Sequence, residues 1–259
     1  MTGPTPLVLM YHGVAQVPRS LDPANIFVTK EAISHQIARL TERHGFRPLT
    51  EAQYLAALAG ERSVPSNSCL VTFDDGYASV LDEAAPLLAA ARVPAICYVS
   101  PGLLGAQPDR SEPAASARLD RDGVRALREY GIEIGCHSDL HASMRGMSAE
   151  RLRAATSVAR EEMKALFGHT PRTFAYPYGD HDAAARAAVR EAGFECAFAT
   201  YEGYGRFALP RVDINATDTP FTFDLKLRRL YPFVRRSLGR VPVVRRATHH
   251  VVGYAPRQP

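Results

Sequence analysis

The chain alternates short apolar runs with segments of helical period, and this alternation restricts the fold more than any other feature of the sequence. Strands separated by helices predict a parallel sheet covered by those helices. Seven such units in a chain of 259 residues favour an α/β fold with a closed or nearly closed barrel over an open doubly wound sheet. The predicted strands span residues 7–13, 69–76, 95–100, 132–138, 173–179, 195–200 and 209–214.

Three of the intervening helices can be placed by their caps. Ser, Thr or Asp before an apolar periodic stretch predicts a helix start, and Gly after it predicts the end. These signals predict helices within residues 29–45, 148–168 and 182–193. Residues 105–120 are rich in Pro, Ala and Ser and lack periodicity, so we expect a surface loop there that rims a cleft.

Composition places the chain among ordinary globular proteins, with 46% hydrophobic and 22% charged residues. The four cysteines are widely spaced and form no CxxC pair, which predicts reduced, buried thiols. The N-terminus lacks a basic stretch followed by an apolar one, so no signal peptide is expected. No run approaches the roughly 20 apolar residues that span a bilayer. We therefore expect a cytoplasmic protein.

Charge is distributed unevenly along the chain. Residues 224–259 carry a net charge of +8, whereas residues 1–223 carry −4, and we divide the chain into a barrel domain and a basic tail at that point. In one interpretation, residues 224–246 form an amphipathic element that lies on an anionic membrane, at the inner membrane face. In the other, a helix packs on the barrel with a solvated basic face. No nucleic-acid motif is present, and no nucleic-acid partner is expected.

Polar side chains stand where five of the predicted strands end. In α/β barrels this end of the sheet carries the working residues, so we expect these side chains to converge on one mouth. They are His12, Asp74, Asp75, His137, His141, Tyr178, Arg211 and Asp213.

Two of these groups have the composition of a metal site. His137 and His141 are spaced i,i+4, which brings both imidazoles to one side if the chain turns helical after its strand. With a carboxylate from another strand they would suit zinc with an open position, although HxxxH also occurs by chance on helix surfaces. Asp74 and Asp75 can both reach the mouth only if the chain turns at Gly76. The alternative is a pair of aspartates that caps the following helix.

Tyr178 and His12 each have a functional and a structural interpretation. The backbone N–H near Tyr178 could stabilise an oxyanion, or the segment could be a hydrophobic turn. His12 is the only ionisable group in its strand, and it could donate a proton to a leaving amine or be a buried core histidine.

These residues together resemble the polysaccharide deacetylase family with NodB homology. "TFDDG" at 72–76 resembles its first motif and "HSDLH" at 137–141 its second, and the order of segments is similar over residues 7–214. The resemblance implies a distorted (β/α)7 barrel that hydrolyses the acetyl group of an acetylated amino sugar. It implies Asp74 as general base, and one divalent ion, Zn²⁺ first, with Co²⁺, Ni²⁺ or Mn²⁺ as alternatives. The implied ligands of that ion are Asp75, His137 and His141.

The chain departs from the family pattern at two places. Ala175 stands where the third motif commonly has an arginine that orients the base, and we expect Arg211 with Asp213 to replace it. The usual late Leu-x-His motif is missing after Arg211. The opening "MYHGV" resembles the branch that includes poly-N-acetylglucosamine deacetylases, so we assign the proton donor to His12.

The resemblance leaves the substrate open. The leading expectation is N-deacetylation of a glycan, a glycolipid or a glycosylated natural-product intermediate. Alternatives on the same fold are an O-deacetylase, a deformylase or a non-sugar amidase. A carbohydrate-binding barrel without activity is a further alternative, and the missing arginine is the feature that favours it.

Overall fold

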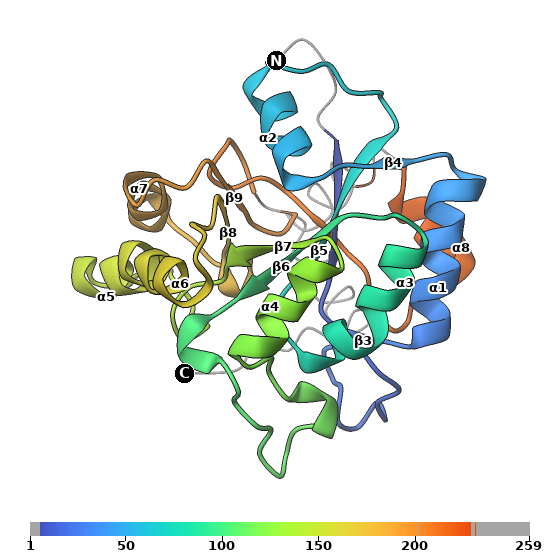
Figure 1. The fold of residues 1–259 in the computed structure, drawn as a ribbon, viewed down its shortest axis with the longest axis horizontal. Helices are drawn as coiled ribbons and strands as arrows, with labels where there is room; N and C mark the ends of the chain where they lie inside the picture. Colours follow the sequence, from blue (N-terminus) through green and yellow to red (C-terminus); the bar gives the residue numbers. More distant parts are fainter. Residues whose placement is uncertain (1–5, 202, 229–230, 232–259) are drawn as a thin grey trace, which may run out of the picture.

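The computed structural model describes residues 6–201, 203–228 and 231, and a curved parallel sheet forms its centre (Figure 1). Seven of its strands overlap the seven predicted runs. They are β1 Leu7–Tyr11, β5 Ser68–Phe73, β6 Ala95–Val99, β7 Ile132–Cys136, β8 Thr173–Ala175, β9 Cys196–Phe198 and β10 Val212–Asp213. Their order is β10-β1-β5-β6-β7-β8-β9, and all neighbours are parallel.

The segment from Leu209 to Asp213 joins the two edges of this sheet. Phe198 of β9 bridges in parallel to Leu209, and the same segment continues into β10, which pairs with β1. The α/β fold with a distorted (β/α)7 barrel is therefore confirmed. Three two-residue strands accompany it: β4 Arg47–Pro48 pairs with β5, while β2 Gly13–Val14 and β3 Phe27–Val28 form a separate small sheet.

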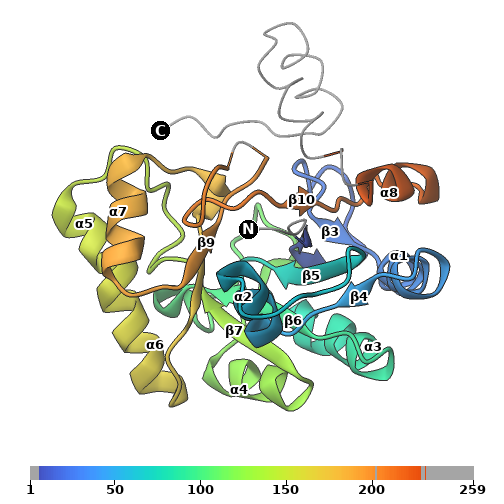
Figure 2. The same cartoon turned by 90° about the horizontal axis from the view of Figure 1, so that it is seen from above.

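Helices cover the outside of the barrel, as Figures 1 and 2 show. The three predicted helix starts are confirmed, since Thr29, Ser148 and Asp182 each accept a hydrogen bond from the first helical turn. The α-helices are α1 Lys30–Ala38, α2 Glu51–Ala59, α3 Ala85–Ala90, α4 Arg121–Glu129, α5 Ala149–Arg153, α6 Ala159–Phe167, α7 Ala183–Glu191 and α8 Pro220–Lys226. Short π-helical stretches continue α1 at Arg39–Arg43, precede α3 at Val80–Ala84 and join α5 to α6 at Ala154–Val158.

Successive strand residues face two different hydrophobic clusters, as the two-residue period of a strand requires. In β5, Val71 and Phe73 belong to the large cluster under the outer helices, whereas Leu70 belongs to a smaller cluster inside the barrel. Helix α2 adds Tyr54 and Leu58 to the inner cluster and so closes the end of the barrel where the strands begin. The opposite end, where the strands finish, is left as the mouth.

The predicted boundary between residues 223 and 224 falls within α8. Phe223 and Leu227 are buried against the barrel, and Lys226 forms an ion pair of 2.6 Å with Asp218. Of the segment 224–246 predicted to contact a membrane, all but residues 224–228 and 231 lies outside the described residues.

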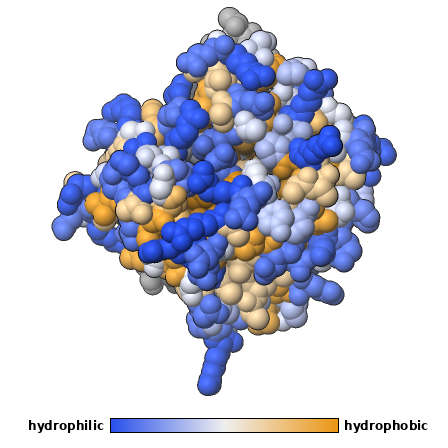
Figure 3. All heavy atoms as spheres, in the orientation of Figure 1, coloured by the Kyte–Doolittle hydropathy of each residue, from blue (hydrophilic) through white to orange (hydrophobic). Residues whose placement is uncertain are grey.

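All four cysteines are buried and free, which confirms the predicted thiols. Within the part of the chain that the structure describes, no helix is both long enough and apolar enough to cross a bilayer. Hydrophilic side chains cover most of the face seen in Figure 3, with apolar ones scattered among them.

Candidate active site and metal centre

Strand β5 and the turn after it bring Asp74 and Asp75 to the mouth. The strand alternation that points Leu70 inward also points Asp74 inward, and the Asp74 N–H continues the ladder by donating to Tyr11 O at 2.9 Å. Asp75 then takes a left-handed φ of 74°, and Gly76 follows with a φ of 63°. The predicted turn is confirmed and begins one residue early, at an aspartate, which tolerates this conformation better than most residues. The alternative, a helix cap, is wrong, since no side chain caps the helix that follows.

His137 and His141 follow strand β7, and their imidazoles do converge. The centroids of the two rings lie 4.8 Å apart. They converge without the helical turn that the i,i+4 spacing would require, because Ser138 and His141 have left-handed φ values of 63° and 55°. The His141 N–H donates to Ser138 Oγ at 3.1 Å, which holds this irregular turn in place.

Asp75 completes a cluster of three potential ligands. Its Oδ1 lies 3.4 Å from His137 Nε2 and 2.7 Å from His141 Nε2, and the three ligand atoms lie within 4.8 Å of one another. Burial alone would raise the pKa of Asp75, but His141, His137 and Arg118 hold it well below its ordinary value. The Asp75 carboxylate is therefore ionised, and the cluster is nearly closed to solvent.

The hydrogen bond on the far side of His137 tests whether the cluster fits a cation. His137 Nδ1 lies 2.7 Å from Ala175 O, and a carbonyl can only accept, so Nδ1 must carry a proton. If His137 carries a proton on Nδ1 alone, the lone pair of Nε2 points at Asp75 Oδ1, and these two acceptors repel unless a proton or a metal ion lies between them. Apart from the two imidazoles, Oδ1 has no hydrogen-bond partner among the described residues. The residues fit a divalent ion, and the carbonyl of Ala175 is the orienting group that metal-binding histidines usually have.

Arg211 holds Asp74 from the interior of the barrel. Its two terminal nitrogens donate to Asp74 Oδ1 at 2.7 Å and to Oδ2 at 2.6 Å, and one of them also donates to Thr72 Oγ1 at 3.2 Å. Burial would raise the pKa of Asp74, but the Arg211 guanidinium and then His137 outweigh it and hold that pKa below its ordinary value. The carboxylate is therefore ionised and fixed in orientation by Arg211, as expected for the residue that replaces the arginine missing at Ala175.

Asp213, the predicted companion of Arg211, has other partners. Its carboxylate accepts hydrogen bonds from Tyr201 and, at 2.8 Å, from Asn215 Nδ2. The structure thus joins Arg211 to Asp74 and places Asp213 in a separate network at the rim.

His12 lies beside these charged groups. Its Nδ1 is buried and has no hydrogen-bond partner among the described residues. Burial lowers the pKa of His12, and the carboxylates of Asp75 and Asp74 oppose this effect only in part. The imidazole is therefore neutral at rest, with Asp75, Asp74, Arg211 and His137 all close enough to act on its charge.

Tyr178 lies on the other side of His141. Its ring meets the His141 ring edge-on, with the centroids 4.7 Å apart, and half of the residue (51%) is exposed. Tyr178 has a left-handed φ of 58°, and the next residue must be glycine, because a Cβ on Gly179 would lie 2.5 Å from Thr200 Cγ2. This turn holds the ring of Tyr178 against His141.

Two contributors could not be found in the sequence. Arg118, from the loop 105–120, donates through Nη1 to Asp75 O, and that nitrogen lies 3.7 Å from Asp75 Oδ2. The carbonyl of Ala175 is the other, and a backbone group leaves no signal in residue type. The expectation that residues 105–120 rim the site is supported by the Arg118 contact.

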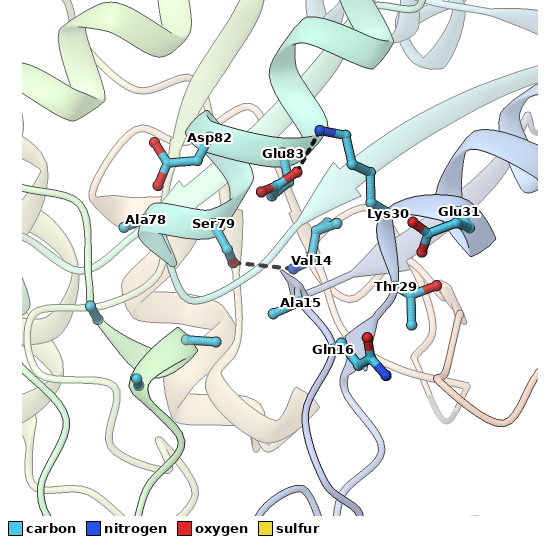
Figure 4. A pocket seen from close by; sticks show the side chains of 13 residues that line it. Val14, Ala15, Gln16, Thr29, Lys30, Glu31, Ala78, Ser79, Asp82 and Glu83 are labelled. Atoms are coloured by element: carbon cyan, nitrogen blue, oxygen red, sulfur yellow. Dashed lines mark hydrogen bonds and ion pairs between the residues drawn. The ribbon is translucent and has the colours of Figure 1, made fainter.

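A cavity of about 480 Å³ lies among the segments that follow β1 and β5 (Figure 4). It is lined by residues that follow β1 and β5, by the first turn of α1, and by residues 114–117. The Val14 N–H donates to Ser79 Oγ at 3.1 Å across one wall, and Lys30 pairs with Glu83 at 2.8 Å on another. Asp74, Asp75, His137 and His141 do not line this cavity. Like Asp74 and Asp75, several of its lining residues follow the end of β5.

Comparison with known proteins agrees with the fold and the motifs. Residues 61–197 match the family model described as polysaccharide deacetylase, a span that includes Asp74, Asp75, His137 and His141 but neither His12 nor Arg211. The poly-β-1,6-N-acetyl-D-glucosamine N-deacetylase of Escherichia coli K12 is 22% identical over 244 residues. That alignment covers 80% of this chain and 36% of the longer E. coli protein.

Two solved structures share the fold. The deacetylase PplD of Streptococcus pyogenes, in complex with acetate, superposes with a TM-score of 0.76 at 18% identity, over 88% of this chain and 100% of that one. IcaB from Ammonifex degensii superposes with a TM-score of 0.71 at 23% identity, over 87% and 96% of the respective chains. At these identities the likeness concerns the arrangement of strands and helices.

Proposed function

The chain belongs to the polysaccharide deacetylase family, and from this premise we propose that it is a metal-dependent hydrolase that removes the N-acetyl group from an acetylated amino sugar and releases acetate. The observation that carries the proposal is the pairing of two units at one mouth. One is the cation-fitting cluster of Asp75, His137 and His141, and the other is the Asp74 carboxylate held ionised by Arg211.

The cluster of Asp75, His137 and His141 would bind the ion that acts as the electrophile. Two imidazoles and one carboxylate are a donor set suited to Zn²⁺, with Co²⁺, Ni²⁺ or Mn²⁺ as substitutes. An ion held there would polarise the acetyl carbonyl and lower the pKa of water. The protein's own contribution is to fix the donors: Ala175 O sets the tautomer of His137, and the left-handed turns aim His141 and Asp75.

We propose that Asp74 is the general base. Its Oδ2 lies 4.0 Å from His137 Nε2, so the carboxylate borders the same space as the metal ligands. The fork of Arg211 occupies one lone pair on each oxygen, and each oxygen keeps a second lone pair that can accept a proton. The hold on Asp74 lowers its basicity but keeps it ionised and correctly placed.

His12 and Tyr178 are proposed to serve the leaving group and the developing charge. His12 borders both carboxylates and is neutral at rest, so it can take up a proton during the reaction and pass it to the departing amine. The backbone N–H of Tyr178 belongs to the turn beside His141, which suits it to donate to an oxyanion.

We propose an oligomeric or polymeric amino sugar as the substrate. The E. coli relative is named for a poly-N-acetylglucosamine, and the cavity of about 480 Å³ behind the ends of β1 and β5 falls within the range of ligand pockets. We propose that this cavity holds another unit of the same sugar chain.

Acetate release from an acetylated amino-sugar panel tests the proposal. The panel contains N-acetylglucosamine monomers, β-1,6 and β-1,4 oligomers, and an O-acetylated sugar, each assayed with Zn²⁺ and with Co²⁺ after chelation. We expect N-acetylated oligomers to be hydrolysed, and Asp74→Asn to lower kcat by about 10²–10⁴-fold, as the loss of a general base does. Asp122→Asn, at an exposed position on α4, is the matched control and should keep full activity. No acetate from the wild-type protein with either metal would contradict the proposal, and release from the O-acetylated sugar alone would favour an O-deacetylase.

A further inference from the structure

The turn that carries Asp75 is held by a second segment, residues 117–119 at the end of the loop 105–120. The Ala78 N–H donates to Ala117 O and the Leu119 N–H donates to Gly76 O, both at 2.8 Å. Between these bonds, Tyr77 and Arg118 form an antiparallel bridge. The loop therefore pairs with the Asp75 turn as a short strand would.

The side chain of Arg118 reaches across this pairing to Asp75 itself. Its Nη1 donates to Asp75 O and lies 3.7 Å from Asp75 Oδ2. The guanidinium also stacks over the ring of Tyr77, 4.2 Å from its centroid, and only 18% of the Arg118 side chain is exposed. Arg118 is thus fixed by the residue two positions beyond Asp75 and fixes Asp75 in return.

These contacts give the two oxygens of Asp75 different surroundings. Oδ1 faces the imidazoles of His137 and His141, whereas Oδ2 faces the Arg118 guanidinium. Without that second partner, the Asp75 carboxylate would keep only its contact with Tyr77 on this side, and it could more readily rotate about its last bond and present either oxygen, or both, to a cation. The contact between Arg118 and Asp75 O also supports the left-handed backbone of Asp75, which costs about 1–2 kcal/mol in most residues.

We propose that Arg118 is a positioning residue for the metal centre: it commits Asp75 to binding a divalent ion through Oδ1 alone and so sets both the affinity and the geometry of the site. The inference rests on the metal dependence in the proposed function. Arg118 itself contacts neither the ion nor the substrate in this role.

If Arg118 only held the loop 105–120 in place, its replacement would have a different effect on metal binding. Replacing Arg118 would then lower thermal stability and leave the coordination of a bound ion unchanged. The visible absorption of bound Co²⁺ reports the number and geometry of its ligands, so it separates the two roles.

The experiment titrates Co²⁺ into the chelator-treated full-length protein, following calorimetric heat and visible absorption. We expect Arg118→Ala to weaken Co²⁺ binding by about 10–100-fold, the usual effect of removing a partner of a metal ligand, and to alter the spectrum. Arg118→Lys keeps the charge but lacks the planar fork, so its affinity for Co²⁺ should lie between those of the wild type and Arg118→Ala. Arg110→Ala, an exposed arginine on the same loop, is the matched control and should match the wild type.

Circular dichroism of each metal-free variant shows whether it is folded, and Arg118→Lys carries the test if Arg118→Ala unfolds. The inference is overturned if the folded variants bind Co²⁺ as tightly as the wild type and with the same spectrum. A wild-type protein that binds no Co²⁺ would overturn both this inference and the proposed metal dependence. Arg118-dependent Co²⁺ binding without acetate release from any sugar would support this inference and remove the proposed function.

Discussion

At the scale of single residues, Arg211 shows how the barrel interior tolerates a charge. Its guanidinium is 1% exposed and lies over the rings of Tyr98 and Phe198, a setting in which an unpaired charge would be very costly. Asp74, Thr72 Oγ1 and Ala199 O accept its hydrogen bonds. Breaking a buried pair of this kind typically costs about 3–5 kcal/mol, so Asp74 stabilises the fold as well as serving the proposed reaction.

Glu51, at the opposite end of the barrel, gives stability a pH dependence. Burial raises the pKa of Glu51 from 4.5 to about 7, and the hydrogen bond from Thr173, at 2.7 Å, offsets this only in part. Between those two pH values the folded protein keeps a proton that the unfolded chain has lost. The free energy of unfolding should therefore fall as pH rises through this window, by about 3 kcal/mol in all.

Urea denaturation of the wild type and Glu51→Gln at pH 5 and pH 8 checks this prediction. Gln cannot ionise, and its carbonyl can still accept from Thr173, so the variant should be the more stable protein at pH 8 and close to the wild type at pH 5. Glu61→Gln, at an exposed position after α2, should keep the wild-type pH dependence. An equal fall in stability for Glu51→Gln and the wild type would show that another group is responsible.

At the scale of elements, β7 supports the site through a glycine. A Cβ on Gly135 would lie 2.2 Å from Tyr98 Cε1, so the ring of Tyr98 packs flat on the strand. That ring lies under Arg211 and has its centroid 6.4 Å from that of His137, and its hydroxyl donates to Thr173 Oγ1 at 3.0 Å. Any larger residue at position 135 must displace Tyr98, whose ring borders both site residues.

Gly135→Ala should accordingly reduce activity more than its effect on stability would suggest. Overpacking of this kind costs about 1–3 kcal/mol, and the displaced Tyr98 should also disturb Arg211 and His137. Ile134→Val, on the opposite face of β7, should cost about 1 kcal/mol and leave Tyr98 in place. The measurement compares the loss of kcat with the loss of unfolding free energy in both variants. Similar kcat values in the two would contradict the role given to Gly135.

Elements and site residues differ in how far the sequence predicts them. The seven main strands are predicted because nearly all their residues are buried and apolar, whereas β2, β3 and β4 are two residues long and leave no periodic signal. Asp74, Asp75, His137 and His141 are found by motif. The turns that bring these residues together are not predicted, since Ser138 and His141 are not glycines and their residue types do not by themselves predict a left-handed φ. Arg118 acts through a loop whose contacts exist only once the barrel has formed.

At the scale of the whole molecule, charge separates the barrel from the end of the chain. Residues 1–223 carry −4 and residues 224–259 carry +8, yet the first residues of that basic segment belong to the barrel. Asp224 pairs with Arg39 and, at 2.9 Å, with His44, while Lys226 is buried. A truncation that separates the two parts must therefore leave α8 intact.

We propose that the basic segment 224–246 attracts an anionic membrane surface. Removal of the residues beyond Arg228 should abolish sedimentation with phosphatidylserine-containing vesicles, since about 1 kcal/mol per basic residue is lost. Added salt should weaken binding of the full chain, and neutral vesicles serve as the control. Equal sedimentation of the full and shortened chains would contradict the proposal that residues 224–246 bind a membrane.

The ion pair between Asp74 and Arg211 also has a consequence for the order in which the protein is made. It joins residues 137 positions apart, whereas the three proposed ligands all lie within residues 75–141. During synthesis, the ribosome completes the parts of the metal cluster well before it delivers the arginine that holds the base. Because loop closure over such a distance is entropically costly, this contact should form late in folding. A chain that stops short of its last strand would carry every metal ligand and still lack the support of its base.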